Sequence, residues 1–174
     1  MAANILPAMQ VWHPWRTLGT HFPHIVVSCE YQLPEGVRGW WRGNTIWLCK
    51  TLNQAERRST LTHELLHVTR GLAPPDLRDR EERRVDELAA RKLIPLPELL
   101  HGLQWSTNDD ELAEALWTDV HTVRVRRETL TPIEIAWLDK HLDDEMQASP
   151  APCIASVPRH DRGLVRQPLT FAAV

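Results

Sequence analysis

Residues 53–71 read NQAERRSTLTHELLHVTRG, and the rest of the chain can be interpreted around them. Asn53 and Glu56 have the spacing of a capping box, in which each side chain accepts a hydrogen bond from the other residue's backbone N–H. Gly71 suits the end of a helix, and the two prolines soon after it prevent continuation. The sequence therefore predicts a helix from about residue 54 to residue 70.

This helix contains the pattern H-E-x-x-H. His63 and His67 lie about 40° apart on one helix face, so both imidazoles can reach one ion. Glu64 lies beside them, placed to polarise a metal-bound water. The opposite face is expected to pack into the core through Leu61, Leu65, Val68 and Leu72. A surface histidine pair on an amphipathic helix is the plainer alternative, and a third ligand decides between the two.

A second helix is predicted from about residue 79 to residue 93, with an apolar side formed by Val85, Ala89, Ala90 and Leu93. Glu82 and Asp86 fall in the middle of that side. Buried carboxylates are costly unless they are paired, hydrogen-bonded or bound to metal. We interpret Glu82 as the third metal ligand and Asp86 as the hydrogen-bond partner of a ligand histidine. Pairing with arginines of a neighbouring element is the alternative.

Before these helices, a strand is expected over residues 24–33 and a hairpin over residues 38–49, with its turn at Arg42-Gly43-Asn44. Together they predict a small antiparallel sheet of about three strands. Residues 1–23 are expected to be irregular, with Trp12 and Trp15 packing on another part of the chain.

After the second helix, short helices are predicted at residues 97–101, 109–116 and 121–129. A final helix is expected to begin at Pro132, capped by Thr131. The chain beyond Met146 is rich in proline and is expected to lack a fixed structure. Residues 109–127 have a partial helix-turn-helix rhythm, which we interpret as a packing or partner-docking module rather than a DNA-binding one.

The composition narrows the class of protein. The 174 residues carry 20 basic and 23 acidic side chains, so the net charge gives no reason to expect nucleic-acid binding. Three cysteines, an odd and small number, argue against a disulfide framework, and the first residues lack the pattern of a signal peptide. No stretch is apolar enough to span a membrane. We therefore expect a cytoplasmic protein.

The chain resembles the ImmA/IrrE family of metallo-endopeptidases in three ordered features. These are an arginine, Arg58, five residues before the first histidine, the H-E-x-x-H pattern itself, and the downstream run ERRVDELAARKLIP at residues 82–95. The matched region, about residues 45–95, is under a third of the chain. Leu66 departs from the pattern, since the family usually has a small residue there.

The resemblance implies an α+β fold: a small zincin-like metallopeptidase core, with a three-stranded sheet and active-site helices, followed by a C-terminal helical segment. It divides the chain into a peptidase domain (1–105), a helical appendage (106–146) and a tail (147–174). By the same resemblance, His63, His67 and Glu82 bind the metal, Glu64 is the general base and Asp86 orients a ligand. In zincin-type folds an edge strand, for which residues 45–48 are the candidate, can bind an extended substrate.

The implied function is that of a zinc-dependent endopeptidase whose protein substrate is a helix-turn-helix transcriptional repressor, so that cleavage switches on mobile-element, prophage or stress genes. A His/His/Glu site also accepts Mn²⁺. The alternative is a non-catalytic regulatory protein that binds a repressor or DNA through residues 106–145. The intact Glu64 favours the enzyme.

Overall fold

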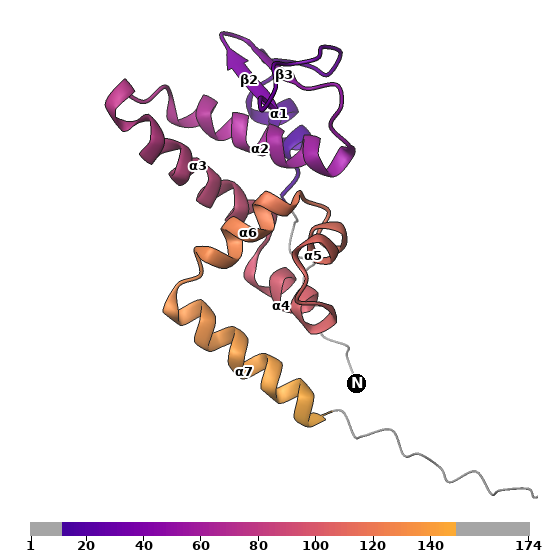
Figure 1. Ribbon diagram of the computed structural model, residues 1–174. Coiled ribbons are helices and arrows are strands. Elements are labelled where there is room, and N and C mark those ends of the chain that lie inside the picture. The colour runs from indigo at the N-terminus through magenta and orange to yellow at the C-terminus, as the bar shows by residue number, and fades with distance from the viewer. Residues whose placement is uncertain (1–11, 149–174) are drawn as a thin grey trace, which may run out of the picture.

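The computed structural model describes residues 12–148, and within that range the chain forms seven α-helices, a short 3₁₀ helix and a small sheet (Figure 1). In order these are α1 (Pro14–His21), β1 (Val26–Ser28), β2 (Gly39–Arg42), β3 (Thr45–Leu48), α2 (Gln54–Arg70), η1 (Pro75–Leu77), α3 (Arg78–Leu93), α4 (Leu96–Trp105), α5 (Asp109–Ala115), α6 (Val120–Glu128) and α7 (Pro132–Ala148). The fold is α+β, as the sequence predicts. None of these helices is long and apolar enough to cross a membrane.

The sheet is mixed, so the prediction of an antiparallel sheet is wrong. Its order is β1–β3–β2, with β3 parallel to β1 and antiparallel to β2. The predicted hairpin is confirmed, since Arg42 pairs with Thr45 across the turn. The connection from β1 to β2 reverses the chain but leaves a gap one strand wide. Because β3 turns back into that gap, it runs parallel to β1. The first strand is also shorter than the predicted residues 24–33.

The order of the strands also changes which one is exposed at an edge. Residues 45–48 form β3, which pairs on both sides and therefore has no edge to offer a substrate. The strand at residues 45–48 is present, but the expectation that it lies at an edge of the sheet is wrong. The edge strand that contacts α2 is β2.

Residues 1–23 are predicted to be irregular, and this prediction is wrong for Pro14–His21, which form α1. Pro14 occupies the first turn, where its missing N–H costs nothing, and the Nδ1 atom of His13 accepts a hydrogen bond from the Arg16 N–H (3.4 Å). Trp12 packs as expected, because its indole N–H donates to Thr62 Oγ1 in α2 (3.1 Å). Trp15, in contrast, is exposed.

Helix α2 has the boundaries that its sequence predicts. Asn53 and Glu56 form both hydrogen bonds of the capping box, at 2.9 and 2.8 Å. Leu61 and Leu65 are buried in the core between α2 and the sheet. Leu72 is 84% exposed, so its predicted place in the core is wrong, because the helix has already ended.

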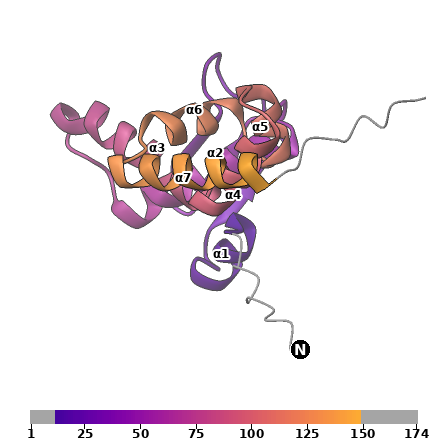
Figure 2. The ribbon, with the colours of Figure 1, turned by 90° about the horizontal axis from the view of Figure 1, so that it is seen from below.

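The end of α3 and the helices after it share a second core, formed by Leu93, Ile94, Leu99, Leu112, Ala113, Val123 and Leu138. The boundary predicted near residue 105 cuts across this core. Helix α4 is longer than predicted, and α7 reaches Ala148, so residues 147–148 of the predicted tail are helical. The rest of that tail, 149–174, lies outside the described residues. In Figures 1 and 2, α7 lies on the far side of this core from the sheet.

Candidate metal centre

Three side chains from α2 and α3 bring donor atoms to one point. The Nε2 atoms of His63 and His67 lie 3.0 Å apart. The Oε2 atom of Glu82 lies 3.3 Å from each of them. The two helices thus bring together the three residues that the sequence singles out, and this group can hold a metal ion.

The spacing of these atoms fits a tetrahedral ion. Ligand atoms at about 2.0–2.1 Å from a tetrahedral zinc ion lie about 3.3–3.4 Å from one another. The observed separations of 3.0–3.3 Å are close to that value. Two imidazoles and one carboxylate also form a donor set found at catalytic zinc sites, which leave a fourth position for water or substrate.

The packing of α3 on α2 sets this arrangement. Leu66 packs against Val85 and Ala89, all three buried, and this contact fixes the register of the two helices. Glu82 lies one turn before Val85 and faces His67. Its side chain is 48% exposed, so the prediction that it lies in the middle of a buried stripe is wrong. The angle on a helical wheel gives the direction of a side chain, but it does not tell how much of that side chain the neighbouring helix covers. The centre therefore opens to solvent on the Glu82 side.

Asp86 orients the first histidine. Its Oδ1 atom lies 3.0 Å from Nδ1 of His63, so the predicted hydrogen bond to a histidine of the group is present. With the Nδ1–H donated to Asp86, the lone pair of the Nε2 atom points toward His67 and Glu82. Burial opposes ionisation of Asp86, but hydrogen bonds from His121 and His63 outweigh it and hold its pKa well below the usual value. Asp86 is therefore a carboxylate at neutral pH.

The pKa values of the two histidines shift in opposite directions. Burial tends to lower the pKa of His63, but the hydrogen bond and charge of Asp86 outweigh burial and raise it. Burial and the neighbouring His63 lower the pKa of His67. His67 is thus favoured in the neutral form, which is the form that binds metal.

Glu64 lies behind the donor group, between α2 and β2. Its side chain is buried, and burial raises its pKa to about 7. The charge of Glu82 also raises this pKa, whereas His63 and a hydrogen bond from the Trp41 N–H lower it. A cation bound at the adjacent histidines would lower this pKa again. A carboxylate that titrates near neutrality is suited to take and return a proton.

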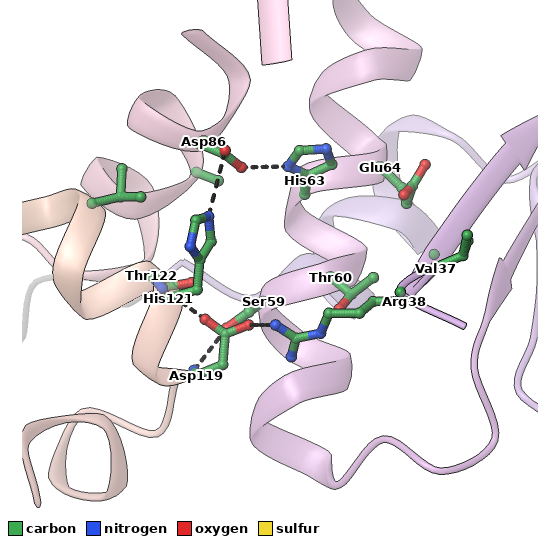
Figure 3. A pocket seen from close by; sticks show the side chains of 14 residues that line it. Val37, Arg38, Ser59, Thr60, His63, Glu64, Asp86, Asp119, His121 and Thr122 are labelled. Atoms are coloured by element: carbon green, nitrogen blue, oxygen red, sulfur yellow. Dashed lines mark hydrogen bonds and ion pairs between the residues drawn. The ribbon is translucent and has the colours of Figure 1, made fainter. Parts of the chain in front are cut away.

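A cleft of about 340 Å³ opens beside the centre (Figure 3). Residues of β2, the segment before it, α2, α3 and α6 line it: Gly36, Val37, Arg38, Gly39, Ser59, Thr60, His63, Glu64, Asp86, Ala89, Asp119, His121, Thr122 and Val125. Four of these belong to the predicted helical appendage. That segment therefore forms one wall of the cleft.

Sequence reasoning did not single out His121 as a candidate site residue. In the structure its Nε2 atom lies 3.4 Å from Oδ2 of Asp86, the oxygen that does not contact His63. The hydrogen bond to Asp86 is the largest effect on its pKa and raises it. More than fifty residues separate His121 from His67, so no local spacing points to it.

An ion pair also crosses the cleft. The guanidinium of Arg38, just before β2, lies 2.7 Å from Oδ2 of Asp119. Asp119 caps α6 by accepting the Thr122 N–H at 2.7 Å, and its own N–H donates to Ser59 Oγ on α2. The start of α6 is thus held to both α2 and the β2 segment (Figure 3).

Arg58, one of the three features of the family resemblance, bonds to neither the sheet nor the metal-binding residues. It is 4% exposed, and its guanidinium donates to the backbone carbonyls of Trp12, Leu116 and Trp117. It therefore joins α2 to the turn after α5 and to the chain before α1.

Comparisons with family models, with curated proteins and with solved structures found no match to this chain. The functional argument therefore depends on the geometry of the site.

Proposed function

We propose that this chain is a zinc-dependent endopeptidase. The observation that carries the proposal is the convergence of the Nε2 atoms of His63 and His67 with Oε2 of Glu82, at 3.0–3.3 Å, beside a buried carboxylate in the wall of an open cleft. The donor set, the exposed Glu82 side and the Asp86 hydrogen bond to His63 each support a catalytic rather than a closed structural site.

Zinc in such a site lowers the pKa of a water molecule and polarises a carbonyl group. Glu64 accepts a proton from the water that attacks the scissile carbonyl and then donates it to the leaving amine. Its raised pKa supports this role because the group can take and return a proton near neutral pH, and the hydrogen bond from the Trp41 N–H orients its carboxylate. Asp86 keeps His63 in the tautomer that presents its Nε2 lone pair.

The edge of β2 supports binding of an extended peptide. In a two-residue hairpin closed by Arg42 and Thr45, alternate residues of β2 direct their backbone groups away from β3. These residues are Gly39 and Trp41, and both adjoin Glu64. The Trp41 N–H already donates to Glu64, so the backbone groups left for a substrate strand are those of Gly39 and the Trp41 carbonyl. A substrate strand paired with this edge would run past the general base.

The finer parts of the proposal come from the ImmA/IrrE resemblance. They are a zincin-like identity for the core, a helix-turn-helix repressor as the protein substrate, and action inside the cytoplasm. The small mixed sheet packed on α2 and the antiparallel α2–α3 pair are compatible with such a core. Mn²⁺ remains the alternative metal.

The test combines metal content with cleavage. The purified chain is expected to bind one zinc ion and to cut a quenched fluorescent peptide library, as well as a helix-turn-helix repressor encoded beside its gene. Glu64→Gln should keep the zinc and lose cleavage, whereas His101→Ala, on the exposed face of α4, should retain both. Undiminished cleavage by Glu64→Gln, or a wild-type chain that binds no metal, would refute the proposal.

A further inference from the structure

We propose that His121, on α6, is a positioning residue for the metal centre: it holds one oxygen of Asp86 so that the other oxygen orients His63. The inference rests on the proposed metal-dependent function and deepens it. It makes the C-terminal helical segment part of the centre rather than an appendage.

The carboxylate of Asp86 lies between two imidazoles. Its Oδ1 atom contacts Nδ1 of His63 at 3.0 Å, and its Oδ2 atom contacts Nε2 of His121 at 3.4 Å (Figure 3). The three side chains come from α2, α3 and α6. One carboxylate therefore connects a histidine of the metal-binding group to a helix that supplies no atom to that group.

The second contact is needed because an aspartate held on one side is poorly oriented. The terminal torsion of aspartate is broad and roughly two-fold, so a single hydrogen bond leaves the carboxylate free to rotate. His121 engages the other oxygen and restricts that rotation. The ring of His63 then keeps the tautomer and the angle at which its Nε2 atom faces His67 and Glu82.

The backbone of His121 is well placed to act as a support. It lies in the first turn of α6, which Asp119 caps and which the ion pair from Asp119 to Arg38 ties to the β2 segment. Deeper in the same helix, Val123 is fully buried against the core that α3 and α4 share. The position of His121 relative to Asp86 is thus set by packing that does not involve the histidine itself.

The exposure of His121 makes the inference testable. Its side chain is 61% exposed and lines the cleft, so replacing it removes little packing. The charged groups that face it are Asp86 on α3, Asp119 on α6 and Arg38 before β2. Asp86 is the one that also contacts a histidine of the metal-binding group.

The experiment measures zinc affinity by competition with a chromophoric chelator, for the full chain. Removing the hydrogen-bond partner of a metal ligand typically weakens metal binding about 10- to 100-fold. His121 contacts that partner, Asp86, rather than a ligand, so we expect His121→Ala to weaken zinc binding about 3- to 10-fold. His121→Gln retains an N–H donor and should recover part of the loss. His101→Ala, an exposed histidine on α4, is the matched control and should bind as the wild type does.

A double-mutant cycle separates positioning from a general structural effect. In an Asp86→Ala background the histidine has no carboxylate to hold, so His121→Ala should then cause no further loss of zinc affinity. Full additivity of the two losses, or wild-type affinity in His121→Ala, would overturn the inference. In a peptide-cleavage assay, His121→Ala should lower kcat more than it raises KM.

The two proposals fail in different ways. A wild-type chain without zinc affinity refutes the metal-dependent function, and the His121 inference with it. A wild-type chain that binds zinc and cuts peptides, together with a His121→Ala variant of unchanged affinity, refutes only the role of His121. Thermal unfolding of each variant identifies any that lose affinity because they do not fold.

Discussion

A methyl group added to Gly39 would lie 2.7 Å from Oε1 of Glu64 and 2.6 Å from Cγ2 of Thr60. Strand β2 thus approaches α2 as closely as it does because residue 39 has no side chain. Gly39→Ala should push the Glu64 carboxylate out of place while leaving His63, His67 and Glu82 untouched. Because small displacements of a reacting group are costly, we expect peptide cleavage to fall about 10- to 100-fold, measured as kcat/KM, with zinc affinity unchanged.

Gly19→Ala is the matched control for this substitution. Gly19 lies in α1, where an added methyl group meets nothing within 4 Å, so alanine should leave cleavage unchanged and favour the helix slightly. Cleavage by Gly39→Ala at the wild-type rate would mean that Glu64 either moves freely or does not act as the base.

Asp86 offers a second test, on the metal rather than on the reaction. Asp86→Asn keeps the shape of the side chain but removes the charge that orients His63, and the affinity for zinc should fall about 10- to 100-fold in a chelator competition. Asp79→Asn changes an exposed carboxylate on the same helix and should have no effect. Equal affinities for the two variants would contradict the role given to Asp86.

Local patterns in the sequence predicted the parts of the fold that short-range interactions determine. The capping box of Asn53 and Glu56 places α2 correctly, because both hydrogen bonds form within one helical turn. The spacing of His63 and His67 on one helix face follows from the same periodicity. The third member of the group, Glu82, could be predicted because α3 also has a clear apolar side. The exposure of its side chain could not be predicted in this way.

Features that depend on tertiary packing could not be predicted in this way. The strand order follows from how the connection before β2 crosses the sheet, and nothing in the strands themselves encodes it. His121 meets Asp86 only because α6 packs on α3, and Arg58 bonds to the turn after α5 for a similar reason. Each of these contacts joins segments that have no spacing rule in common.

Glu134 gives a prediction for stability and its pH dependence. Burial tends to raise the pKa of Glu134, but hydrogen bonds from the Thr131 N–H and from Arg126 and Arg91 hold it at about 2. Arg126 is 2% exposed, so removing its carboxylate partner leaves a buried charge. Because solvent reaches Glu134 in part, we expect Glu134→Gln to lower the free energy of unfolding by about 1–3 kcal/mol at pH 7.

The sign of the pH effect follows from the lowered pKa. The carboxylate of Glu134 stabilises the folded chain above its ordinary pKa of 4.5, and this contribution is lost as the pH falls toward 2. The difference in thermal midpoint between the wild type and Glu134→Gln should therefore be largest at neutral pH and shrink below about pH 4. Glu128→Gln, at an exposed site on α6, is the control and should differ little from the wild type at any pH. A gap that widens in acid would contradict this account.

The arginines of α6 predict how the chain behaves toward DNA. In a helix-turn-helix protein, the second helix would present such side chains to the major groove. Here Arg126 is buried and donates to the Ile94 carbonyl and to Glu134, while Arg124 and Arg127 pair with Asp109. We therefore expect no sequence-specific binding in a gel shift at about 0.15 M salt, and only weak association that disappears as salt rises. Salt-resistant binding to one sequence that Arg124→Ala abolishes, with the fold intact, would instead favour a DNA-binding regulator.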